Sequence, residues 1–200
     1  MIPSTEDAFV CGELSKAGLR VNSVYDLVNT KRKLGESVIE TLVRILPVVI
    51  HPSVKEGVVR ALTTREARNQ VEDVLLKEFL AIQSDDNGKQ NLKWVIGNAL
   101  SVVAGKDHCR QLLDIARDAG HGKSREMIVL GLGRMKGCHE ANSVLIELLK
   151  DKNVAGHAAK AVCALNCTDA LPELNRLQGS YSGWIAKEFK KAVEKLSAAE

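Results

Sequence analysis

The stretch KNVAGHAAKAVCAL, residues 152–165, followed by TDALPEL at residues 168–174, decides the fold of this 200-residue chain. In the first segment the apolar side chains fall at positions 154, 158, 159, 161, 162 and 165, a spacing that lines one face of an α-helix. In the second segment Pro172 fits the first turn of a helix, because its missing N–H has no helical partner there. The two segments together predict a pair of packed helices.

The same apolar pattern recurs along the chain. Equivalent helix faces occur around residues 54–62, 92–103, 128–135 and 185–196, and the steps between equivalent positions are 38, 32, 30 and 31 residues. A second series of apolar blocks alternates with the first, over residues 36–46, 69–82, 107–118, 140–150 and 170–177. A repeat of 20 to 50 residues is typical of stacked structural units, so we predict an all-α solenoid of helix pairs.

Two shorter helices are expected before the repeats, over residues 5–16 and 21–28, the first with Ser4 and Asp7 in capping-box spacing. We therefore predict one domain over residues 1–200. It comprises N-terminal capping helices within 1–34, repeats within 36–177 and a C-terminal capping helix over 181–198.

The composition agrees with packed helices and adds a constraint on their spacing. The chain is 45% hydrophobic and 26% charged, but only 4% aromatic, and no proline interrupts residues 53–171. A core with so few rings is filled by small aliphatic side chains, so its helices must approach closely. Small residues are expected at these crossings, namely Gly97, Gly131, Gly133, Ala158, Ala159 and Ala161.

Residues 152–174 resemble a HEAT repeat. The likeness lies in the valine after a short polar loop, the paired Ala-Ala, the Ala-Leu at the helix end and the second helix that opens with Ala-Leu. Residues 51–80 and 124–149 fit more loosely, and the arginine that usually follows the family's valine is replaced by Ala155 and Lys55. The resemblance, over about residues 36–196, implies a right-handed solenoid of five to six helix pairs; armadillo-like repeats remain an alternative. It mostly implies a protein-binding scaffold, although a few such families are enzymes or nucleic-acid binders.

Metal binding and hydroxylase chemistry are not supported by the sequence. His108-Cys109, Cys138-His139 and the Cys163/Cys167 pair lie on different repeats, and adjacent helical residues point about 100° apart, so neither mixed dipeptide chelates one ion easily. HEAT-like deoxyhypusine hydroxylases hold iron through several His-Glu dipeptides, whereas this chain has only His139-Glu140. We therefore expect no metal, no cofactor and no enzyme activity.

HEAT-like alkylpurine DNA glycosylases are the nearest enzymatic alternative. They resemble this chain in size and helical content, and they imply a basic groove with aromatic side chains around an extruded base. Neither tryptophan, Trp94 or Trp184, has the aromatic company that such a cleft needs, and a formal net charge of +3 is modest for a nucleic-acid binder. Nucleic-acid binding, with or without base excision, is kept as the second hypothesis. A lyase or hydroxylase-like enzyme on this scaffold is the third.

The expected compartment is the cytoplasm. The N-terminus lacks the basic start and apolar stretch of a signal peptide, and no apolar run approaches the roughly 18 residues that span a membrane. Five cysteines are an odd number in a chain long enough to hold a core unaided, so we expect reduced thiols.

Protein recognition is the function that these observations favour. The second helix of each pair commonly lines the concave, partner-binding surface of a solenoid. The polar residues of these helices mix both charge signs, which suits a protein partner better than a phosphate backbone. We predict an adaptor or an inhibitor, for example a bacterial immunity-type protein. The predicted contact residues are Lys77, Arg110, Asp114, Arg117, Glu147, Lys150 and Arg176.

Overall fold

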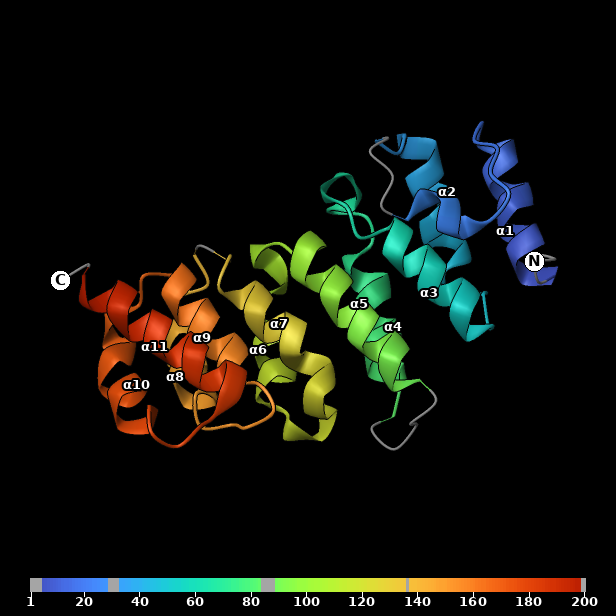
Figure 1. The fold of residues 1–200 in the computed structure, drawn as a ribbon. Coiled ribbons are helices and arrows are strands. Elements are labelled where there is room, and N and C mark those ends of the chain that lie inside the picture. Colours follow the sequence, from blue (N-terminus) through green and yellow to red (C-terminus); the bar gives the residue numbers. More distant parts are fainter. Residues whose placement is uncertain (1–4, 29–32, 84–88, 136, 199–200) are drawn as a thin grey trace. The chain divides into compact units, whose positions relative to one another are not determined.

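The computed structural model describes residues 5–28, 33–83, 89–135 and 137–198, and every regular element in these ranges is helical (Figure 1). The predicted all-α class is therefore confirmed. Ser4 of the expected capping box lies outside the described residues. No helix in the described ranges combines the length and apolar character needed to cross a membrane.

The chain divides into two compact units, residues 1–104 and 105–200, and each is described by itself. The first unit contains α1 (Thr5–Lys16), η1 (Val24–Leu27), α2 (Glu36–Ile45), α3 (Pro52–Ala61), η2 (Arg65–Ala67), α4 (Glu72–Ala81) and α5 (Gln90–Val103). Helix α1 begins and ends at the residues predicted for it, 5 and 16. The helix expected over 21–28 is only one 3-10 turn, held by Ser23 and Asp26 in a capping box.

Within the first unit, α1 packs on α2, and α5 packs on both α3 and α4 (Figure 1). The side chains between these helices are the predicted aliphatic ones, and Leu42, Val58, Leu75 and Leu100 are fully buried. A few polar side chains are also buried in this unit, and among them Lys93 of α5 is 1% exposed. Its ammonium group donates to the Ile82 carbonyl oxygen at 2.6 Å and lies 4.9 Å from the centre of the Phe79 ring.

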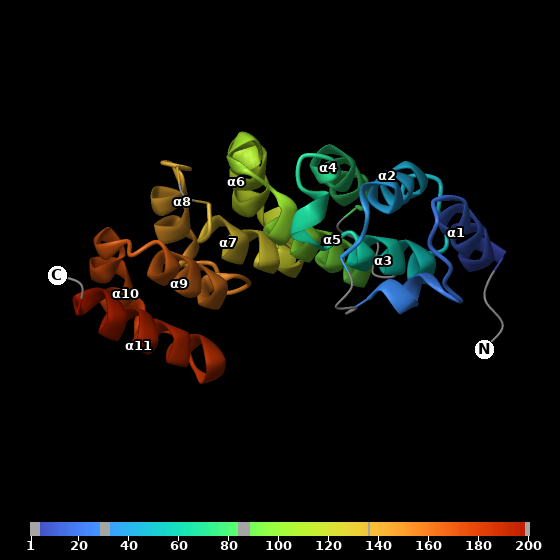
Figure 2. The ribbon, with the colours of Figure 1, turned by 90° about the horizontal axis from the view of Figure 1, so that it is seen from above.

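The second unit has the clearest alternation of helices. Its elements are η3 (Lys106–His108), α6 (Cys109–Arg117), η4 (Ala119–Arg125), α7 (Glu126–Leu132), α8 (Ala141–Leu148), α9 (Ala155–Ala164), η5 (Thr168–Ala170), α10 (Leu171–Leu177) and α11 (Gly183–Ser197). Helix α9 packs between α7 and α11, and α6, α8 and α10 pack on α7, α9 and α11 respectively. Figure 2 shows α6 and α8 side by side above α7 and α9.

Close helix crossings in this unit depend on glycine, as expected for Gly133. A Cβ atom at Gly133 would lie 2.6 Å from the Cα of Ala161 and 2.9 Å from its carbonyl oxygen, both backbone atoms. Gly156 of α9 is equally constrained, because a Cβ there would overlap the Trp184 ring of α11. The other two glycines named from the sequence, Gly97 and Gly131, are buried in α5 and α7.

We expect Gly133→Ala to lower the free energy of unfolding by about 1–3 kcal/mol, because the added methyl group meets backbone atoms that cannot rotate away. Gly12→Ala is the matched control. Gly12 is exposed within α1 with open space at its Cβ position, so alanine should stabilise the chain by about 1 kcal/mol through helix propensity. Urea unfolding of the two variants measures the difference, and equal effects would show that the crossing has room for a methyl group.

A fully buried arginine, Arg125, joins three turns of the second unit. No pattern in the sequence predicts its burial. Arg125 is 0% exposed. Its guanidinium donates to the carbonyl oxygen of Ala116 at 2.6 Å and to that of Gly122 at 3.1 Å, and it forms an ion pair with Asp151. Asp151 in turn accepts from the backbone N–H of Asn153 at 2.9 Å. The end of α6, the η4 segment and the α8–α9 turn thus share one hydrogen-bonded centre.

We expect Asp151→Asn to lower the free energy of unfolding by about 3–5 kcal/mol, because it leaves the fully buried guanidinium of Arg125 without its counter-charge. Arg125→Met should cost about 1–3 kcal/mol, because Asp151 is 24% exposed and water can solvate part of its carboxylate. Arg176→Ala serves as control, since that side chain is 59% exposed and its ion pair should contribute little to stability. Chemical denaturation provides the measurement. Losses below about 1 kcal/mol for Arg125→Met would contradict the central role of this pair.

Candidate functional site

Six of the seven charged residues predicted as a partner surface lie on or beside three alternate helices of the second unit, α6, α8 and α10. Arg110, Asp114 and Arg117 are on α6, Glu147 is on α8, Lys150 lies two residues after the end of α8, and Arg176 is on α10. All six are exposed. The seventh predicted residue, Lys77, is exposed on α4 of the first unit. The structure thus groups six of the seven within one compact unit.

Two of the ion pairs join α6 to the two ends of α8. The Arg110 guanidinium lies 3.8 Å from a carboxylate oxygen of Glu140, and its Nε is 3.5 Å from Asp114. Arg117 Nε lies 3.3 Å from Glu147 Oε2. Each interhelical pair is separated by 30 residues in sequence, which equals one repeat step. Opposite charges therefore occupy equivalent positions of neighbouring repeats.

A third interhelical pair continues the series from α8 to α10. Lys150 Nζ lies 3.5 Å from a carboxylate oxygen of Glu173. Arg176 binds both oxygens of the same carboxylate, at 2.7 and 2.9 Å. The hydrogen bond from Arg176, aided by the charge of Lys150, lowers the pKa of Glu173 to about 2. The carboxylate therefore stays charged throughout the physiological pH range.

We call these residues the charge ladder: Arg110, Asp114, Arg117, Glu140, Glu147, Lys150, Glu173 and Arg176. In most of its ion pairs the charged groups are exposed and the nitrogen–oxygen distance exceeds 3.2 Å, so these pairs are weak. Glu140 was missed as a ladder member because its sequence context, His139-Glu140, suggested only a metal dipeptide. The 30-residue spacing from Arg110 is the signal that could have identified it.

Two cysteines correct the expectation of fully reduced thiols. Cys109, the first residue of α6, is joined by a disulfide to Cys138 in the segment before α8, with the Cα atoms 5.9 Å apart. The other three, Cys11, Cys163 and Cys167, are free. The pairing was missed because the two residues are 29 positions apart on different elements, and only the packing of α6 beside α8 brings them together. No group of three or more His, Cys, Asp or Glu in the described ranges is arranged to hold a metal ion.

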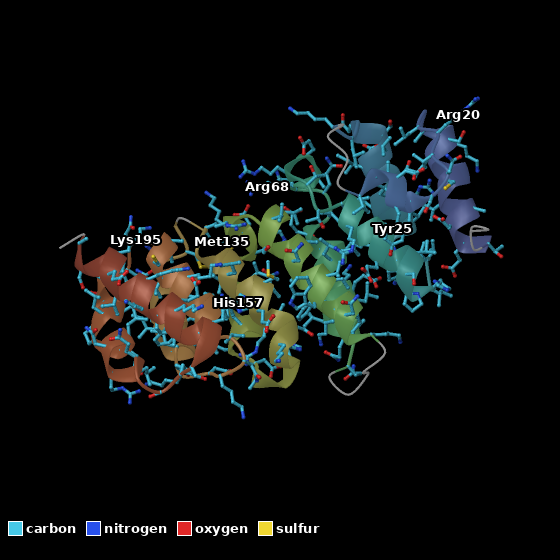
Figure 3. All side chains as sticks on the ribbon, viewed as in Figure 1. Arg20, Tyr25, Arg68, Met135, His157 and Lys195 are labelled. Carbon is cyan, nitrogen blue, oxygen red and sulfur yellow. A yellow bond between two sulfur atoms is a disulfide. The ribbon has the colours of Figure 1, made fainter. Side chains whose placement is uncertain are left out.

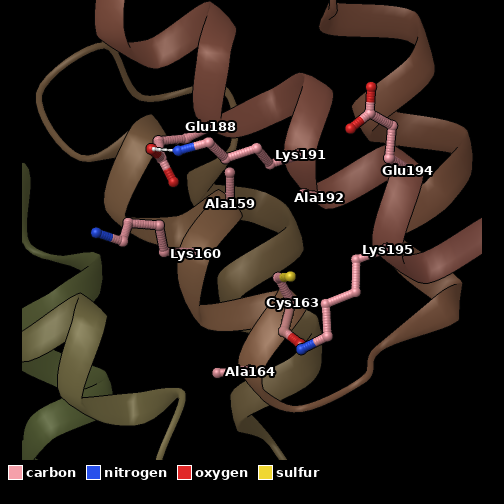
Figure 4. Close-up of a pocket in the computed structure, with 9 residues that line it drawn as sticks. All are labelled: Ala159, Lys160, Cys163, Ala164, Glu188, Lys191, Ala192, Glu194 and Lys195. Carbon is pink, nitrogen blue, oxygen red and sulfur yellow. Dashed lines mark hydrogen bonds and ion pairs between the residues drawn. The ribbon is translucent and has the colours of Figure 1, made fainter.

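A groove of about 470 Å³ lies between α9 and α11 (Figure 4). Its floor is formed by Ala159, Cys163 and Ala192. Two of the three lysines that line it have internal partners: Lys191 pairs with Glu188 at 3.0 Å, and Lys195 donates to the Cys163 carbonyl oxygen at 3.1 Å. The Lys195 contact joins α11 to the end of α9, so we interpret the groove as part of a helix contact.

His157 and Trp184 form an aromatic pair at the other end of the α9–α11 contact. Their ring centres are 5.0 Å apart, and His157 Nδ1 has no hydrogen-bond partner among the described residues (His157 is labelled in Figure 3). The Trp184 ring rests on Gly156, so this tryptophan packs α11 against α9. The second tryptophan, Trp94, is on α5 of the first unit.

Burial lowers the pKa of the His157 imidazole below its ordinary value, and the charges of Glu126 and Glu188 only partly oppose this effect. The unfolded chain therefore binds the proton more tightly than the folded one. The stabilising contribution is complete above the unfolded pKa of about 6.5 and is lost as the pH falls through the folded pKa.

We expect the free energy of unfolding to fall between pH 7.5 and pH 5.5, and His157→Leu to reduce the slope of that fall. Urea unfolding at a series of pH values measures the slope. His139→Gln is the control, because His139 is exposed and this substitution should leave the slope as in the wild type. An unchanged slope in His157→Leu would contradict the assignment.

Comparison with known proteins adds no family to this geometry. No protein-family model matches the sequence, and no curated protein matches it.

Proposed function

We propose that the chain is a non-catalytic protein-binding module that recognises its partner through the charge ladder. The observation that supports this most directly is the sign pattern of the ladder. Arg110, Arg117 and Lys150 each face an acid on the next helix, so positive and negative groups alternate across an exposed surface. Such a pattern selects a partner with the complementary alternation, which gives specificity and guides association.

The proposed architecture is a HEAT-like, right-handed α-solenoid of five to six helix pairs. The packing of α7, α9 and α11 in succession, each with its own second helix, supports this architecture within the second unit. In a HEAT-like array, α6, α8 and α10 would line the concave side, and Lys77 of α4 would belong to the same series of second helices. The proposed role is that of an adaptor or a stoichiometric inhibitor, such as an immunity-type protein, in the cytoplasm.

Nucleic-acid binding is less well supported. A surface that binds a phosphate backbone gains affinity by replacing counterions with Lys and Arg side chains. Here Glu140, Glu147 and Glu173 stand within 4 Å of the basic groups and would repel phosphates. The ladder therefore favours a protein partner over a nucleic acid.

We expect Arg110→Glu combined with Arg117→Glu to abolish partner capture, because the double substitution reverses both arginines that pair with α8. Affinity purification from the native host followed by mass spectrometry measures capture, and circular dichroism confirms that helicity is kept. Lys187→Glu combined with Lys190→Glu is the matched control: it makes the same change in charge at exposed positions of α11. The proposal fails if both double variants retain, or both lose, the same partner.

A further inference from the structure

We propose that the Cys109–Cys138 disulfide is a reversible redox site. Its oxidation state determines how rigidly the first pair of the charge ladder, Arg110 and Glu140, is held. Its regulatory meaning rests on the proposed function of the ladder, whereas the redox behaviour itself does not. The proposal is based on the position of the two cysteines. Arg110 directly follows Cys109, and Glu140 lies two residues after Cys138. The covalent bond thus holds together the two segments that carry the Arg110–Glu140 ion pair.

The Arg110–Glu140 ion pair depends on the disulfide more than the other interhelical ion pairs of the ladder do. Arg110 and Glu140 are 74% and 58% exposed and 3.8 Å apart, so their attraction is strongly screened by solvent. Glu140 is the N-cap residue of α8, and its carbonyl oxygen accepts from the Val144 N–H at 3.2 Å. The backbone just before it is held by single turns, from the Cys138 N–H to the Met135 carbonyl oxygen and from the Ala141 N–H to the Cys138 carbonyl oxygen. The Arg117–Glu147 pair, in contrast, connects the C-terminal ends of α6 and α8, far from the disulfide along both helices. Opening the disulfide should therefore loosen the start of α8 and leave its middle in place.

The two sulfur positions differ in the way that thiol exchange requires. Cys109 is half-buried, whereas Cys138 is 7% exposed, so an external thiol reaches the Cys109 side. In a reducing compartment, the location proposed above, disulfides are usually transient or redox-sensing.

The exchange balances with a low-molecular-weight thiol/disulfide couple such as glutathione. On oxidation, the Cys109 thiolate attacks glutathione disulfide, which forms a mixed disulfide and releases one glutathione. The Cys138 thiolate then attacks the Cys109 sulfur, the bond to glutathione breaks, and the second glutathione leaves. Two electrons and two protons pass from the protein thiols to the two glutathione molecules, and reduction follows the same steps in reverse.

The first experiment needs no partner. Full-length protein is equilibrated with graded ratios of reduced glutathione to glutathione disulfide, free thiols are trapped with iodoacetamide, and the peptides that contain Cys109 and Cys138 are quantified by mass spectrometry. We expect both thiols to appear together as the ratio rises. In Cys109→Ser, Cys138 should lose its protein disulfide at every ratio, whereas Cys163→Ser should titrate as the wild type does. Thiols that are free at every ratio, or a disulfide that survives a hundredfold excess of reduced glutathione, would overturn the proposal.

The second experiment measures the order of the ladder. Hydrogen exchange of residues 138–142 should be at least tenfold faster in the reduced than in the oxidised protein, with residues 144–148 and α11 as internal references. Equal exchange in both states would overturn control of the ladder. When a partner has been captured, reduction should weaken its binding at least fivefold, and unchanged binding would refute the regulatory role. Failure to capture any partner would count against the proposed function alone, because the titration and the exchange measurement do not involve one.

Discussion

The arrangement of the second unit depends on the buried contact between Arg125 and Asp151. A guanidinium that is 0% exposed can be accommodated only if its charge is compensated and its donors are satisfied. Ala116, Gly122 and Asp151 meet this requirement, and they belong to the end of α6, to η4 and to the turn before α9. Two consecutive helix pairs are therefore tied through one side chain. The distance between α6 and α8 that the ladder requires follows from this connection.

The second constraint is the close approach of α7 and α9. Gly133 meets the backbone of Ala161, and both lie in the layer formed by α7, α9 and α11. Helices that pack this closely in one layer bring their partners α6 and α8 close in the other. Side chains of ordinary length, such as Arg117 and Glu147, can then reach one another across the gap. The scarcity of aromatic residues and the existence of the ladder thus have a common cause.

Much of the fold could be predicted from the sequence, because apolar periodicity reports directly on which face of a helix is buried. The first helix was predicted to the residue, and the alternation of helices over residues 105–200 followed from repeated faces such as that of 154–165. What depends on long-range geometry could not be predicted. Arg125 has no local pattern that marks it as buried, Cys109 and Cys138 are distant in sequence, and the 21–28 segment has too few residues for periodicity to separate a helix from one 3-10 turn.

The candidate site was predictable as a set of residues but not as a set of pairs. Knowing the pairs changes the physical interpretation, because a partner that binds the ladder must compete with contacts already made within the chain. An arginine such as Arg117 gives up Glu147 when it accepts a carboxylate from a partner, and Glu147 then needs a basic group from the same partner. The net gain per exchange is small, since one exposed ion pair replaces another. Recognition through such a surface therefore rests on matching several pairs at once, and a partner with only one sign of charge would leave half of the ladder uncompensated.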